Sequence, residues 1–235
     1  MAGFQTRFED LPAEFAVFPL SGVLLLPRGR LPLNIFEPRY LAMTEDALAA
    51  GRMFAMIQPD PTLPDTPNGP ALYRVGCLGR LSSFSETDDG RLLITLTGLA
   101  RFSVASEIDM RRGYRRVIGD FSRYRADLNE PDDTAIDRDR LLEALRGYFA
   151  HRGIEPNWEA INRLTDDALV VTLAMVCPFE PIEKQALLEA SGDAERADTL
   201  LALLRMGAAE PPGPDGGPSG NAGEYDAGEH RRRLS

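Results

Sequence analysis

The chain has 235 residues, of which 43% are hydrophobic and 26% are charged, a balance that is ordinary for a globular protein of one or two domains. Its formal net charge of −10 disfavours a general binder of nucleic acid or of anionic membranes, because phosphate contacts need clustered lysine and arginine. Basic or neutral polypeptides fit this charge better as partners.

Cys77 and Cys177 lie far apart in the sequence and share no metal-ligand or redox spacing. We expect two buried, reduced thiols, as in a cytosolic protein, while a disulfide between them stays open as an alternative.

The apolar run of residues 17–26 follows several acidic residues and contains Pro19, which argues against a signal peptide. No stretch approaches the length of a membrane span, so we expect a cytoplasmic protein.

Residues 15–40 are too apolar for a solvated linker and too rich in proline for one helix. Each proline fixes φ and removes a backbone donor, so the apolar runs between them predict short strands or extended crossings. Phe15 to Leu20 predicts a strand that ends in a turn at Ser21-Gly22. Pro38 predicts the first residue of a helix that runs to Ala50.

The next hundred residues predict a β region. Met53 to Gln58 predicts a short buried strand, and the proline-rich residues 59–70 predict an exposed loop. Leu72 to Phe84 alternates between apolar and polar residues, which is typical of a half-buried strand. A turn at residues 88–90 follows, and a less regular strand is expected from Arg112 to Tyr124.

Gly98 interrupts a second alternating run, which begins at Leu92. Because the alternation resumes in register after Gly98, we interpret this glycine as a sharp bend or a close backbone approach rather than a strand end.

The second half of the chain predicts helices. The acidic residues 127–139 predict a solvated linker that enters a helix, and the apolar stripe from Ile136 to Phe149 predicts that helix, which Gly153 breaks. Thr165 can cap a helix that stops before Cys177-Pro178. Two more helices are expected over 180–190 and after Asp193. Gly and Pro dominate residues 211–223, which predicts a disordered tail.

Residues 18–40, FPLSGVLLLPRGRLPLNIFEPRY, resemble the N-terminal substrate-recognition domain of ATP-dependent Lon proteases. The likeness continues through Gly76 to Leu81, through Gly98, Arg101 and Phe102, and through Pro181 to Leu204, so it covers about residues 14–206. The positions that match the family's opening motif are Phe18, Pro19, Leu20, Pro27, Leu31, Pro32, Leu33, Ile35, Phe36, Glu37, Pro38, Arg39 and Tyr40.

The resemblance implies an α+β fold, with a PUA-like β pseudo-barrel that carries an N-terminal helix, followed by a C-terminal helical bundle subdomain. We expect the β subdomain over 1–126, the helical subdomain over 127–206 and the disordered tail over 207–235.

The family also implies recognition of exposed apolar segments of polypeptides. The candidates for peptide or protein binding are Leu24, Leu25, Leu26, Pro27 and Tyr40. The alternative for the three leucines is that they belong to the core. We interpret the other motif residues as structural, with Phe36 as a buried anchor and Glu37 beside the positive end of the helix. These structural residues are Phe18, Pro19, Pro32, Phe36, Glu37, Pro38 and Arg39.

Full-length Lon proteases add an ATPase and a Ser-Lys protease, and this sequence supports neither. Its single lysine, Lys184, follows Glu183 on a predicted helix, which is not the context of an ATP-binding P-loop. We interpret Lys184 as a solvated or C-terminal-turn residue of that helix and His151 as a cation at a helix end. No metal-ligand spacing is present either. We therefore expect no catalytic residue, no metal and no cofactor.

Six arginines between residues 111 and 125 are divided between two strand faces, so they do not form a stripe that follows phosphates. Two functions remain. The first is a non-catalytic protein that binds peptides or unfolded polypeptide segments. The second is an adaptor or regulator that docks on a separate protease or another folded partner. The partner and the oligomeric state stay open.

Overall fold

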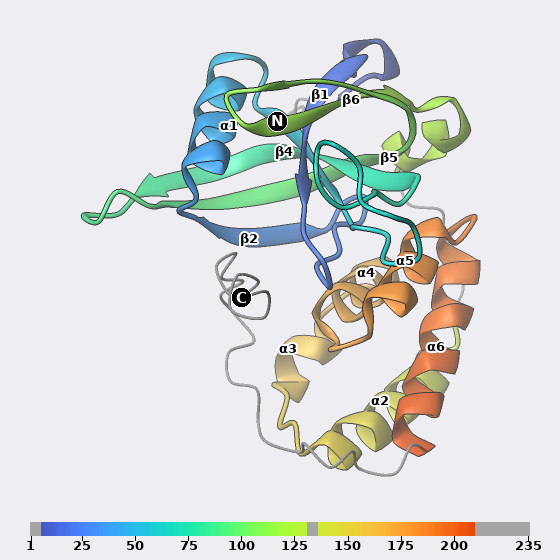
Figure 1. The fold of residues 1–235 in the computed structure, drawn as a ribbon. Helices are drawn as coiled ribbons and strands as arrows, with labels where there is room; N and C mark the ends of the chain where they lie inside the picture. Colours follow the sequence, from blue (N-terminus) through green and yellow to red (C-terminus); the bar gives the residue numbers. More distant parts are fainter. Residues whose placement is uncertain (1–5, 131–135, 210–235) are drawn as a thin grey trace. The chain divides into compact units, whose positions relative to one another are not determined.

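The computed structural model describes residues 6–130 and 136–209. Their contacts divide the chain into two compact units, and the division falls after Glu130. The first unit holds the strands and α1, and the second holds α2 to α6 (Figure 1). The disordered tail was expected over 207–235, but residues 207–209 belong to α6 (Asp193–Ala209), and residues 210–235 lie outside the described residues.

The first unit is built on a six-stranded sheet in the order β2-β5-β4-β3-β1-β6. Because β5 also pairs with β6, the strands β5, β4, β3, β1 and β6 form a closed ring, and β2 lies outside the ring beside β5. The expected pseudo-barrel is confirmed. The strands are β1 (Glu14–Pro19), β2 (Arg30–Ile35), β3 (Met53–Ile57), β4 (Val75–Glu86), β5 (Leu92–Arg111) and β6 (Tyr114–Asp120).

The barrel interior is filled by alternate side chains of these strands. Phe15 of β1 meets Phe102 of β5 edge to face, with ring centroids 4.8 Å apart. Both residues belong to one buried cluster. The cluster also includes Phe121, which lies between β6 and the 3-10 helix that follows it. The 3-10 helices of this unit are η1 (Phe8–Asp10) and η2 (Ser122–Leu128).

Two prolines of the opening motif occupy positions that tolerate a missing N–H. Pro32 lies in β2, which is an edge strand because β5 is its one partner among the described residues. Pro38 is the first residue of α1 (Pro38–Ala49), as predicted. Helix α1 packs against β3 and β6.

Gly98 lies inside β5, and the strand continues past it, as the sequence predicted. The extended segment before β2 is hydrogen-bonded to this point of the strand. The N–H of Arg28 donates to the carbonyl of Gly98 at 2.9 Å, and the N–H of Gly98 donates to the carbonyl of Gly29 at 2.9 Å. The close backbone approach expected at Gly98 is confirmed.

The second unit is helical. Helix α2 ends at Gly153, which has a φ of 65°, a left-handed conformation that glycine adopts without steric penalty. The predicted helices near 138–152, 166–176, 181–189 and after 193 are present, and the short α3 was not predicted. The helices are α2 (Arg138–Arg152), α3 (Trp158–Asn162), α4 (Asp166–Val176), α5 (Pro181–Glu189) and α6 (Asp193–Ala209).

Lys184 is buried, with 3% of its surface exposed, so the interpretation of this residue as solvated is wrong. Its ammonium group donates a hydrogen bond to the backbone carbonyl of Met175 at 3.4 Å. Burial lowers the pKa of Lys184, because the interior disfavours the charged form. The helix face that carries Lys184 is therefore an interior face of the helical unit.

Cys77 and Cys177 are both buried free thiols, one in each unit. Burial raises the pKa of Cys177 to about 12.

Asp127 belongs to the barrel and not to a solvated linker, which corrects the expectation for this residue. Its carboxylate accepts hydrogen bonds from the Nε of Arg101 at 2.9 Å and from the Nη2 of Arg101 at 2.7 Å. It also accepts one from the backbone N–H of Arg101 at 2.9 Å. Because both side chains are buried, the pair fixes η2 against β5.

The arginines of residues 111–116 are bound to carboxylates of their own unit. Arg115 is buried and forms a bidentate pair with Glu107, at 2.7 and 2.8 Å. Arg112 pairs with Glu45 and with Asp46 of α1. These pairs occupy guanidinium groups that could otherwise contact a phosphate.

Candidate functional site

The leucine segment 24–26 lies in the interior of the barrel unit. Leu24, Leu25 and Leu26 are 2%, 1% and 0% exposed, and Pro27 is also buried. The expectation that these residues offer apolar surface to a ligand is therefore wrong, and the alternative, that they belong to the core, agrees with the structure. Their burial follows from the crossing over Gly98, which holds the segment against the sheet.

Tyr40, the fifth binding candidate, is also a core residue, with 5% of its surface exposed. Its ring stacks on Phe18, with ring centroids 4.0 Å apart. Burial raises the pKa of Tyr40 to about 12. This residue joins α1 to β1 and is not available to a ligand.

Phe36 is not the buried anchor that we expected, because its side chain is half-buried. The guanidinium of Arg91 lies 5.5 Å from the centre of its ring. The anchors beside it are Ile35 and Tyr40, which are 1% and 5% exposed. Glu37 forms an ion pair with Arg39 at 2.9 Å.

Several large apolar side chains of the barrel unit are exposed, and two of them near the β4–β5 turn do not share a face of the sheet. Phe84, 59% exposed, is the register partner of Ile94, so these two side chains lie on the same face of the sheet. Leu93, 42% exposed, precedes Ile94 in β5 and therefore lies on the opposite face. Singly exposed apolar residues are normal on soluble proteins. A hollow lined by apolar side chains is present instead in the helical unit.

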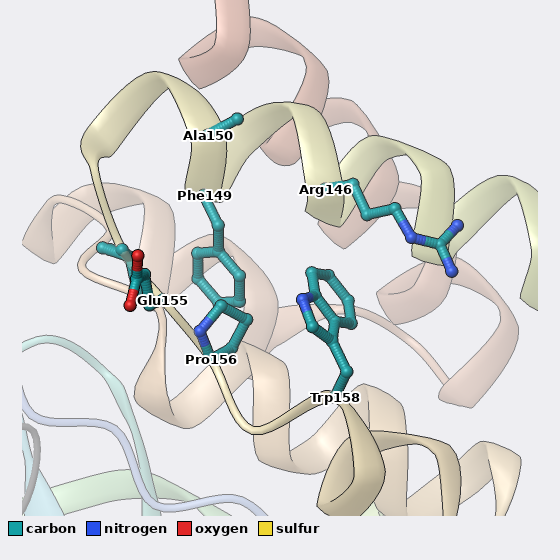
Figure 2. Close-up of a pocket in the computed structure, with 7 residues that line it drawn as sticks. Arg146, Phe149, Ala150, Glu155, Pro156 and Trp158 are labelled. Atoms are coloured by element: carbon teal, nitrogen blue, oxygen red, sulfur yellow. The ribbon is translucent and has the colours of Figure 1, made fainter.

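This hollow, of about 510 Å³, lies between the C-terminal part of α2 and the loop that leads into α3 (Figure 2). Its volume is in the range of pockets that accept a small ligand or a large side chain. Its lining comes from Arg146, Phe149, Ala150, Ile154, Glu155, Pro156 and Trp158. We call it the Trp158 pocket.

The end of α2 shapes the pocket. Gly153 reverses the chain in its left-handed conformation, and the N–H of Ile154 then donates to the carbonyl of Phe149 at 2.9 Å. Residues 154–156 consequently return along the face of α2 that carries Phe149 and Ala150. The side chain of Asn157 caps α3 by accepting a hydrogen bond from the N–H of Ala160 at 3.0 Å. This cap sets the position of Trp158 as the first residue of α3.

Arg138 holds the C-terminal end of α3 in place. Its guanidinium forms an ion pair with Asp166 of α4 at 2.7 Å, and it donates to the carbonyls of Ile161 and Asn162 at 3.3 and 3.2 Å. The short helix that carries Trp158 is thus tied to the start of α2 and to the start of α4.

Two aromatic rings and two charges define the pocket. Phe149 and Trp158 meet edge to face, with ring centroids 6.3 Å apart and an interplanar angle of 60°. The guanidinium of Arg146 lies 5.3 Å from the centre of the Trp158 ring. Figure 2 shows Arg146 at one end of the pocket and Glu155 at the other, with Phe149, Pro156 and Trp158 between them.

The lining does not favour catalysis by a hydroxyl, a thiol or an imidazole, because it contains none of these groups. Metal ligation is not favoured either: over residues 6–130 and 136–209, no group of three or more His, Cys, Asp or Glu could hold an ion. An apolar or aromatic side chain can pack in this open hollow against Phe149 and Trp158. Tryptophan, tyrosine and arginine are enriched where such contacts dominate binding.

A family model described as the substrate-binding domain of the ATP-dependent protease La (Lon) matches residues 14–206. This chain belongs to the Lon substrate-binding domain family. The match spans both units, so the Trp158 pocket lies within the part of the chain that is related to Lon.

Curated relatives include the Lon protease of Flavobacterium johnsoniae, 22% identical over 209 residues, and Lon protease 1 of Thermus thermophilus, 27% identical over 200 residues. These alignments cover 84% and 83% of this chain but only 24% and 25% of the two proteases. The Lon-type chain thus spans about a quarter of the length of the curated relatives it matches.

Two solved structures share the fold. A Lon N-terminal domain protein from Xanthomonas campestris superimposes with a TM-score of 0.55 and 23% identity, over 80% of this chain and 97% of that one. The N-terminal domain of the Mycobacterium avium complex Lon protease gives a TM-score of 0.56 and 18% identity, over 81% and 97%. At these identities the likeness shows that the Lon N-terminal fold is shared.

The binding candidates taken from the Lon motif of residues 18–40 all lie in the barrel unit. The sequence analysis did not predict the Trp158 pocket. One signal was available, since Trp158 is the single tryptophan of the chain and follows the sequence Gly153-Ile-Glu-Pro-Asn157. Tryptophan is rarely placed on a surface without a packing or binding role. Within the described parts of this Lon-type chain, no helix combines the length and the hydropathy that crossing a membrane requires.

Proposed function

We propose that this chain is a non-catalytic substrate-recognition module of the Lon type, which binds peptides or exposed apolar segments of unfolded polypeptides in the cytoplasm. The observation that carries the proposal is the Trp158 pocket, an apolar hollow within the region that matches a substrate-binding family. An unfolded polypeptide exposes the aromatic and aliphatic side chains that such a pocket can surround.

Binding can be measured by the fluorescence anisotropy of labelled casein, which lacks stable tertiary structure. We expect saturable binding in the micromolar range. In the variant Ala150→Leu, the larger side chain occupies part of the pocket, because Ala150 is an exposed residue on its wall. We expect this variant to bind at least tenfold more weakly.

Ala202→Leu is the matched control, since Ala202 is an exposed alanine of a helix in the same unit and does not line the pocket. It should bind casein like the wild type. Absence of saturable binding by the wild type, or equal binding by Ala150→Leu, would contradict the proposal. Because Trp158 is the single tryptophan, its emission with a tryptophan-free peptide reports on the pocket directly.

The non-catalytic part of the proposal rests on the composition of the chain. An ATPase of the P-loop class needs a lysine that contacts phosphates, whereas Lys184, the single lysine, is buried in the helical unit. We expect neither ATP hydrolysis nor casein cleavage above buffer controls. An activity that disappears in the variant Lys184→Ala, with the fold retained in circular dichroism, would contradict this part.

A further inference from the structure

The Trp158 pocket carries opposite charges at its two ends, and each charge is open to solvent. Arg146 projects from α2 at one end, and Glu155 belongs to the loop after α2 at the other end (Figure 2). Both side chains are exposed, and neither has an ion-pair partner among the described residues. Most charges of the barrel unit's arginine-rich segment, in contrast, are neutralised by a neighbour.

Arg146 is held in place without its charge being neutralised. Its guanidinium lies 5.3 Å from the centre of the Trp158 ring, and the face of an aromatic ring attracts a cation. The ring leaves the N–H groups of the guanidinium open to a planar carboxylate, to which arginine can donate two hydrogen bonds. Glu155 has only acceptor oxygens when ionised, so it suits an ammonium or a guanidinium group.

The rings between the two charges fix where an apolar side chain would lie. Phe149 and Trp158 are inclined at 60°, and the hollow beside them is about 510 Å³, enough for a phenylalanine or leucine side chain of a bound segment. Residues on both flanks of that side chain, at roughly 3.3 Å per residue of extended chain, then come near the two ends of the pocket.

We propose that the Trp158 pocket reads the charges on both flanks of the apolar side chain that it binds, and that it selects segments with an acidic residue on one flank and a basic residue on the other. The acidic residue meets Arg146 and the basic residue meets Glu155. This inference rests on the proposed function and adds a sequence preference to it. It does not depend on the direction of the bound backbone, since reversing the segment exchanges the two flanks.

Four tryptophan-free peptides of equal length test the selection. Each has a central phenylalanine, and the flanks are acid and base, two acids, two bases, or two glycines. Binding is measured by the anisotropy of a label at the peptide end, at low salt, where exposed charge pairs are least screened. We expect the peptide with unlike flanks to bind about fivefold tighter than either peptide with like flanks, as suits exposed ion pairs.

Charge reversal in the protein should change the preference in a defined direction. Arg146→Glu should prefer the peptide with two basic flanks, and Glu155→Arg should prefer the one with two acidic flanks. The double variant Arg146→Glu with Glu155→Arg should restore the preference for unlike flanks. Both residues are exposed, so these variants should fold, and circular dichroism verifies this.

The outcomes separate the two proposals. Equal affinity of the wild type for all four peptides, or an unchanged preference in Arg146→Glu, would overturn the charge selection and leave the proposed function in place. If no peptide and no casein binds saturably, the proposed function fails and the charge selection fails with it. The preference should also disappear in high salt, and a preference that persists there would contradict an electrostatic origin.

Discussion

The backbone of Leu26 crosses β5 directly over Gly98, so closely that a Cβ atom added to Gly98 would lie 2.0 Å from the carbonyl oxygen of Leu26. No real side chain tolerates that distance. The crossing holds the buried segment 24–26 against the sheet and brings β2 to its place beside β5. The segment 24–26, which the sequence offered as a binding surface, therefore has a structural role.

Gly98→Ala should strongly destabilise the barrel unit, because the added methyl group forces the two backbones apart and strains the hydrogen bonds of Gly98 with Arg28 and Gly29. Overpacking typically destabilises by about 1–3 kcal/mol, and we expect a value at or above the upper end. Gly192→Ala is the control, since its Cβ would meet nothing within 4 Å. Thermal unfolding midpoints of the two variants measure this difference in stability. Equal midpoints would contradict the structural role of the crossing at Gly98.

Leu25→Ala should lower the free energy of unfolding more than Phe36→Ala does. Leu25 is 1% exposed, so its truncation leaves a cavity that typically costs about 2–5 kcal/mol of unfolding free energy. Phe36 is half-buried, and its truncation should be milder. Chemical denaturation of the two variants measures this order. A lower stability for Phe36→Ala than for Leu25→Ala would show that Phe36 is the anchor after all.

Asp127→Ala should leave the guanidinium of Arg101 buried without its carboxylate. Breaking a buried ion pair from one side typically costs about 3–5 kcal/mol, because the remaining charge is desolvated and uncompensated. We expect denaturation at markedly lower urea concentration. Asp139→Ala removes an exposed acid in the first turn of α2 and should cost less than about 1 kcal/mol.

The double variant Arg101→Met with Asp127→Leu tests the same pair in another way. It removes both charges, so much of the lost stability should return. If it were no more stable than Asp127→Ala, the desolvated charge of Arg101 would not explain the loss.

Glu107 should make the stability of the barrel unit depend on pH. Hydrogen bonds from Arg115 hold the pKa of Glu107 below its ordinary value of 4.5. A carboxyl group with a depressed folded pKa stabilises the protein above its unfolded pKa, and that contribution is lost as the pH falls through the folded pKa. Below about pH 5, the wild type should therefore lose more stability than Glu107→Gln.

Urea denaturation at several pH values measures this difference. Glu143→Gln, on an exposed part of α2, controls for the removal of one negative charge. Parallel pH profiles for the wild type and Glu107→Gln would contradict a role of the Arg115 pair in acid stability.

The sequence by itself determined the elements whose signals are local. Pro38 fixed the start of α1, Gly153 fixed the end of α2, and the unbroken alternation across Gly98 indicated a close backbone approach inside one strand. These signals are readable because φ restriction, the missing proline N–H and side-chain periodicity act within a few residues. The Lon resemblance supplied the fold that joins them.

Only the tertiary structure decided which polar and apolar residues are buried. Asp127 looked like one of many solvated acids, but Arg101, far away in the sequence, draws it into the barrel. Lys184 and the leucines of 24–26 are likewise buried by partners that sequence neighbours do not reveal. The Trp158 pocket exists because the turn at Gly153 folds residues 154–158 back onto α2, and burial depends on such long-range packing, which a local pattern does not contain.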